Sequence, residues 1–120
     1  MNIKTKEGNK QYKAGSSFEY RLMRKLAHKG LCVRSAGSHG VVDIILLSKD
    51  FTDLIQCKYT EKDNADLTAL LKGDNIKLFE KLEVSNNTRK FLVIKQGRAN
   101  DPLILRYEPL WEKWIGAFLY

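Results

Sequence analysis

Two apolar segments, residues 42–47 and 51–59, constrain the fold of this chain more than any other feature. Both are rich in β-branched and other large apolar side chains, which is typical of strands. Between them stand Ser48, Lys49 and Asp50, which are typical of a turn. The stretch therefore predicts a β-hairpin.

If Lys49 and Asp50 form a two-residue loop, Asp43 lies directly opposite Gln56 on the neighbouring strand. Side chains alternate along a strand, so Lys58 then shares the face of Gln56. A carboxylate, an amide and an ammonium group converge at the mouth of the hairpin, where such groups are costly to bury without partners. This polar face is either a chemical site or an ordinary ion pair at a strand end. The other face is apolar: Ile44, Leu46, Ile55 and Cys57.

The charge balance favours a polyanionic partner. The 120 residues include 21 Lys and Arg against 14 Asp and Glu, which gives a net charge of +7. Nucleic acid is the first candidate and an anionic membrane surface the second, although a merely soluble basic protein has the same composition. The length and the 43% hydrophobic content predict one compact domain.

Cysteine usage and hydropathy suggest an intracellular location. Cys32 and Cys57 have no CxxC spacing and lie in apolar segments, where a free cysteine behaves as a small hydrophobic residue. No apolar stretch is long enough for a membrane span, and the first residues lack the apolar core of a signal peptide. We expect no membrane insertion.

The hydrophobic pattern predicts an α/β or α+β fold, in which a mixed five-stranded sheet is flanked by helices in the order αβββαββα. Residues 1–14 should form a basic flexible arm before a single domain at 15–120. Gly73 and Asp74 divide the central helical region into two short helices, or mark the start of one. The aromatic last helix, which begins at Pro109, favours a subunit contact over closure of the core. The other predicted segments are a helix at 16–29 and strands at 31–35, 42–47, 51–59, 91–94 and 103–107.

Glu19 is an acid beside the apolar stripe of the first predicted helix. Ser16 and Glu19 have the spacing of a capping box, in which the glutamate bonds back to the first amide of the helix. A role as a metal ligand is the alternative. The polar side of this helix, either phosphate-facing or simply solvated, carries Arg21, Arg24 and Lys25.

Four short motifs resemble the archaeal and viral Holliday junction resolvases of the PD-(D/E)xK nuclease superfamily, over about residues 15–107. The Arg-Ser-Ala-Gly-Ser sequence is the most specific, because the bare acid and lysine pattern recurs in many nucleases. The motifs occupy residues 15–19, 34–38, 42–45 and 56–58.

The resemblance implies a restriction-endonuclease-like core and a catalytic set of Glu19, Ser38, Asp43 and Lys58. Glu19 and Asp43 would hold Mg²⁺, for which Mn²⁺ should substitute, and Lys58 would lie beside the attacking water. Further metal ligands would be the Gln56 side chain and the Cys57 backbone carbonyl. The residues expected to contact DNA are Arg34, Arg21, Arg24, Lys25, Lys62 and Lys72.

Gln56 departs from the family pattern, which has glutamate there. Its amide oxygen can still bind a cation, but the site loses one negative charge, so metal affinity should fall. The resemblance implies a homodimeric endonuclease that cleaves four-way DNA junctions. The alternatives are a restriction or repair nuclease of the same superfamily and a junction-binding protein without activity.

Overall fold

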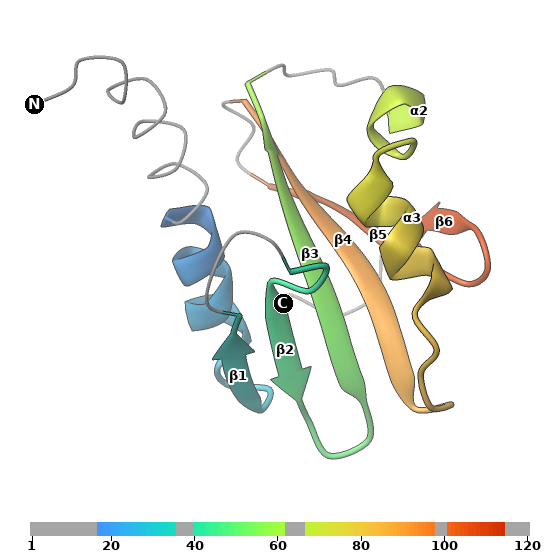
Figure 1. Ribbon diagram of the computed structural model, residues 1–120. Helices are drawn as coiled ribbons and strands as arrows, with labels where there is room; N and C mark the ends of the chain where they lie inside the picture. Colours follow the sequence, from blue (N-terminus) through green and yellow to red (C-terminus); the bar gives the residue numbers. More distant parts are fainter. Residues whose placement is uncertain (1–16, 36–39, 62–66, 98–100, 115–120) are drawn as a thin grey trace, which may run out of the picture.

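The computed structural model describes residues 17–35, 40–61, 67–97 and 101–114. These residues form one mixed sheet of six strands, whose spatial order from β1 to β6 follows the sequence (Figure 1). The strands are β1 Leu31–Arg34, β2 Ile44–Leu47, β3 Thr52–Thr60, β4 Thr88–Gln96, β5 Leu103–Tyr107 and β6 Trp111–Lys113.

Helices cover both faces of the sheet. The described part of the N-terminal helix spans residues 17–26 and packs on one face through Phe18, Leu22 and Leu26. On the other face, α2 (Leu67–Leu70) and α3 (Asp74–Lys81) connect β3 to β4. The general α/β prediction and the division at Gly73 into two short helices are confirmed.

The central pair of strands is parallel and every other pair is antiparallel. Parallel neighbours need a crossover connection, which α2 and α3 supply between β3 and β4. Because β4 is buried along Lys90–Ile94, it forms the floor of both halves of the core. Because β3 and β4 are parallel, their C-terminal ends, at Thr60 and Gln96, lie side by side at the same end of the sheet.

The predicted hairpin register is confirmed over four residue pairs, from Ile44 opposite Ile55 to Leu47 opposite Thr52. The Ser48 amide donates to the Phe51 carbonyl at 3.0 Å, which closes the two-residue loop. The predicted apolar face packs against the N-terminal helix. Its members are Ile44, Leu46 and Ile55, with Cys57 partly buried beside them.

The predicted last helix is wrong at its start, because Trp111–Lys113 is a sixth strand paired with β5. Tyr107 lies opposite Trp111 with ring centroids 5.0 Å apart, and such cross-strand aromatic pairs stabilise a sheet. This pairing outweighs the preference of Pro109 for the first turn of a helix. Trp111 also packs on Phe79, and Trp114 meets the edge of Phe91, so both tryptophans close the core.

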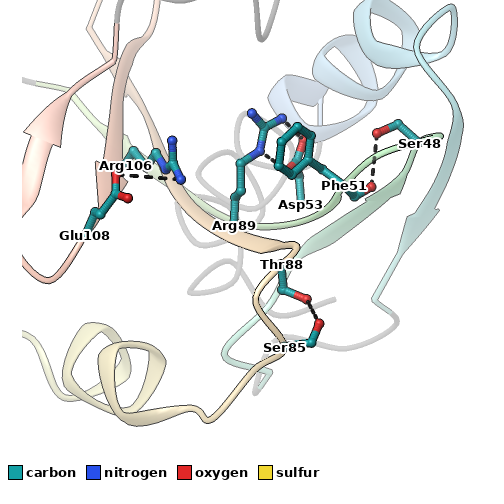
Figure 2. A network of polar contacts seen from close by, with 8 residues as sticks. All are labelled: Ser48, Phe51, Asp53, Ser85, Thr88, Arg89, Arg106 and Glu108. Atoms are coloured by element: carbon teal, nitrogen blue, oxygen red, sulfur yellow. Dashed lines mark hydrogen bonds and ion pairs between the residues drawn. The ribbon is translucent and has the colours of Figure 1, made fainter.

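A buried ion pair fixes β3 beside β4 at the hairpin end of the sheet. Arg89 donates from Nε and Nη2 to the two oxygens of Asp53, at 2.7 and 2.8 Å, and Asp53 is only 1% exposed. Figure 2 shows the Phe51 ring beside this pair, with its centroid 4.0 Å from the Arg89 guanidinium carbon. Asp53 and Arg89 are direct partners in the parallel register. The pair is therefore structural and lies at the end of β3 remote from Lys58.

The C-terminal end of α3 is capped by a lysine from the sheet. Lys90 Nζ donates to the carbonyls of Glu80 and Leu82, at 2.9 and 2.6 Å. Burial lowers the pKa of Lys90, an effect that the negative charge of Glu80 opposes.

The described residues contain no helix long and apolar enough to cross a membrane.

Candidate active site

Asp43 stands where β2 begins, and its backbone joins three strands. Its carbonyl accepts from the Ser35 amide just after β1, and its amide donates to Ile55 on β3, both at 2.8 Å. The regular ladder ends at Ile44, so Asp43 and Gln56 are not the direct pair that the sequence predicts. Instead, Asp43 Oδ2 accepts a 2.7 Å hydrogen bond from the Cys57 amide. Beyond the end of the β2–β3 ladder, the Asp43 carboxylate therefore serves as the acceptor for the Cys57 amide, in place of a backbone carbonyl.

Gln56 is held between the two residues of β3 that bond Asp43. Its side chain is buried, with 2% of the residue exposed, and Nε2 donates to the Val41 carbonyl at 3.0 Å. Gln56 Oε1 is buried, and none of the residues that the structure describes forms a hydrogen bond with it. Since β3 is regular from Thr52 to Thr60, Lys58 projects on the same side as Gln56, as predicted.

Glu19 reaches this region from the N-terminal helix. Burial raises the pKa of Glu19, and the negative charge of Asp43 raises it further, whereas Arg34 lowers it. Burial also raises the pKa of Asp43, against the Cys57 hydrogen bond and the charges of Lys58 and Arg34. The pKa of the Cys57 thiol is raised by burial and then by both carboxylates. The fold thus brings Glu19, Asp43, Cys57, Lys58 and Arg34 into one electrostatic neighbourhood.

Arg34 is the described partner of Glu19. Its Nε lies 3.3 Å from Glu19 Oε1, and its guanidinium carbon lies 4.8 Å from the centroid of the Tyr20 ring. Ser16, the other member of the predicted capping box, lies outside the described residues. The helix therefore presents Glu19 and Tyr20 together to the end of β1.

Carboxylate and amide oxygens are suitable ligands for a hard cation, although this site has few acidic groups. Within the described ranges, no three His, Cys, Asp or Glu side chains form a group that could hold a metal ion. Glu19 and Asp43 supply two carboxylates, whose raised pKa values reflect poorly solvated negative charge. Gln56 Oε1, for which the described residues supply no hydrogen-bond partner, is a neutral oxygen of the kind that Mg²⁺ and Mn²⁺ bind. With two carboxylates, these residues would suit one divalent cation rather than two.

Comparison with protein-family models, curated proteins and solved structures finds no match.

The predicted DNA-contacting residues divide into two groups. Arg34 belongs to the site, whereas four cations lie on exposed helical or turn surface: Arg21, Arg24, Lys25 and Lys72. Ser38 and Lys62 lie outside the described residues, as do residues 1–14.

Sequence reasoning missed Tyr20. It is 51% exposed, on a helix whose buried stripe is Phe18, Leu22 and Leu26. An aromatic residue outside the apolar stripe and adjacent to a predicted ligand was the available signal.

Proposed function

We propose that this chain is a Mg²⁺-dependent endodeoxyribonuclease with a restriction-endonuclease-like core, which cleaves four-way DNA junctions as a homodimer. The observation that carries the proposal is the meeting of Glu19 and Asp43, from the helix and from the start of β2, beside Lys58. Both carboxyl groups have raised pKa values because they are partly buried, and the negative charge of Asp43 raises the pKa of Glu19 further. Such an arrangement is costly unless a cation or a proton compensates the charge.

The order of the elements supports the same proposal. A helix precedes three antiparallel strands, and a helical crossover leads to a strand parallel to β3. This arrangement places the start of β2 and the middle of β3 side by side. The motif residues Asp43, Gln56 and Lys58 come from these two segments.

The chemistry can be assigned to the side chains present. Asp43, Glu19 and the Gln56 amide oxygen would hold the cation, which when bound neutralises charge on the scissile phosphate. The Lys58 ammonium donates hydrogen bonds to the attacking water or to the phosphate oxygens as charge develops on them. The Cys57 amide fixes the Asp43 carboxylate, so this ligand needs no reorganisation when substrate arrives.

One observation favours a second candidate, a protein that binds junctions without cleaving them. Gln56 removes a negative charge from the cation site, and the described residues offer only two carboxylates there. A weak metal site would leave the +7 charge as the main determinant of binding.

A cleavage assay separates the two candidates. A labelled four-way junction and a linear duplex of the same arm sequence are incubated with the protein in Mg²⁺ or in EDTA. We expect cleavage of the junction in Mg²⁺ alone. Equal cleavage of the duplex would favour a restriction or repair nuclease, and binding without cleavage would favour the second candidate.

Two variants test the assignment of the site. Asp43→Asn keeps an oxygen for the Cys57 amide but removes the charged ligand, so cleavage should be lost while junction binding is retained. Asp50→Asn removes a carboxylate from the exposed hairpin turn and should cleave as the wild type does. Cleavage by Asp43→Asn at the wild-type rate would refute the assignment.

A further inference from the structure

Glu19 has two competing uses at the proposed site. As a cation ligand, the Glu19 carboxylate must face Asp43, whose negative charge raises the pKa of Glu19. In the described structure the same carboxylate forms an ion pair with Arg34, at 3.3 Å. A positive charge beside the carboxylates opposes cation binding in the protein without DNA.

The surroundings of Arg34 allow it to exchange the Glu19 carboxylate for another anion. The side chains of Arg34 and Glu19 are 24% and 18% exposed, so an approaching anion can contact the exposed part of Arg34, whereas its Nε, which faces Glu19, is buried. The ring of Tyr20, a residue that is 51% exposed, lies 4.8 Å from the guanidinium carbon in a cation–π contact. A planar guanidinium forms paired hydrogen bonds with phosphate as readily as with carboxylate.

We propose that Arg34 is a positioning residue that couples DNA binding to cation binding: it holds Glu19 in the free protein and releases it when a DNA phosphate takes over the guanidinium. This inference rests on the proposed nuclease function and assigns a regulation to the same site. Release of Glu19 adds a carboxylate oxygen to the cation site at the moment that substrate is present. The coupling matters more here because Gln56 supplies no charge.

The coupling must be reciprocal. If DNA raises the affinity for the cation, the cation raises the affinity for DNA by the same factor. Both directions can be measured without following cleavage. Mn²⁺ bound to the protein alone is counted by electron paramagnetic resonance, and junction binding is followed by fluorescence anisotropy in Ca²⁺ or EDTA at constant ionic strength. A denaturing gel verifies that the junction stays intact in Ca²⁺.

Arg34→Gln is the central variant. Without DNA it should bind Mn²⁺ at least about fivefold more tightly than the wild type, the lower end of ordinary coupling between sites. Arg34→Lys retains the positive charge beside Glu19 and should stay close to the wild type. Arg24→Gln removes a positive charge from the exposed side of the helix that carries Glu19 and should change Mn²⁺ affinity by less than about twofold, because exposed charges are screened.

A double-mutant cycle shows whether Arg34 acts through Glu19. In a Glu19→Gln background, the further change Arg34→Gln should raise Mn²⁺ affinity clearly less than it does in the wild type, because only the direct effect of the Arg34 charge on Asp43 then remains. Ca²⁺ should tighten junction binding of the wild type and do so less for Arg34→Gln. Equal effects of Arg34→Gln and Arg24→Gln, or an Arg34→Gln effect of undiminished size in the Glu19→Gln background, would overturn the coupling.

The failure of this inference differs from failure of the proposed function. If neither the wild type nor Arg34→Gln binds Mn²⁺, the cation site and the metal-dependent nuclease are both rejected. If Mn²⁺ binds and Asp43→Asn abolishes its binding, but Arg34→Gln changes nothing, only the coupling is rejected. Circular dichroism melting of each variant verifies that the compared proteins are folded.

Discussion

The Asp43 carboxylate accepts a 2.7 Å hydrogen bond from the Cys57 amide, yet burial keeps its pKa above the ordinary value of 3.8. The carboxyl group therefore binds a proton more readily in the folded chain than in the unfolded chain. Its contribution to stability is full below pH 3.8 and is lost as the pH rises through the raised pKa. At neutral pH the charged Asp43 destabilises the metal-free fold.

Asp43→Asn should accordingly raise the melting temperature of the metal-free protein at neutral pH. The neutral amide keeps an acceptor for the Cys57 amide and removes the buried charge. The difference from the wild type should shrink as the pH approaches 3.8, where the wild-type carboxyl is protonated. Thermal unfolding in EDTA measures it, with Asp50→Asn as the exposed control; an equal or lower melting temperature for Asp43→Asn at neutral pH would contradict the prediction.

Gln56→Glu should lower the Mg²⁺ concentration needed for half-maximal junction cleavage. Position 56 lies in the sequence of β3 between the two residues whose backbones bond Asp43, and added negative charge would strengthen cation binding. Because position 56 is buried, the same change should lower the melting temperature in EDTA, and Mg²⁺ should restore it. Gln96→Glu, at the end of β4, controls for charge alone. An unchanged or raised Mg²⁺ requirement would show that Gln56 is not a ligand.

Arg89→Met should destabilise the fold by about 3–5 kcal/mol, because it leaves the buried Asp53 carboxylate without its partner. The double variant Asp53→Leu with Arg89→Met removes both charges and should recover most of that loss. Lys77→Met breaks the ion pair with Glu80, in which the lysine side chain is half exposed, and should lower the free energy of unfolding by less than about 1 kcal/mol. Guanidinium chloride unfolding measures all three. A loss below about 1 kcal/mol in Arg89→Met would contradict a structural role for the pair.

Junction affinity should fall steeply with salt and vary little with sequence, because the +7 chain would bind through phosphates. Arg21→Gln removes an exposed cation of the N-terminal helix and should reduce the slope of log affinity against log salt concentration by about one. Glu61→Gln removes an exposed acid and should not reduce that slope. An affinity that is insensitive to salt, or a strong preference for one linear sequence, would count against phosphate recognition.

The sequence by itself determined the features that depend on neighbouring residues. The alternation of Ile44 and Leu46, together with a loop of two polar residues, predicted the hairpin register correctly. The glycine at position 73 predicted the division between α2 and α3. These features follow from strand periodicity and turn chemistry, which act over a few residues.

Tertiary structure alone decided how distant segments meet. Glu19 could serve as a cap or as a ligand, and its ion pair with Arg34 arises only because the helix packs beside the end of β1. The local sequence around Trp111 is typical of a helix, but Trp111 lies in a strand, where it pairs with Tyr107 and packs on the core residue Phe79. Asp43 missed its predicted pairing with Gln56 because the ladder ends at Ile44 and the Cys57 amide claims the carboxylate. For Trp111 and Asp43, contacts formed in the folded sheet outweigh a local preference worth about 1 kcal/mol or less.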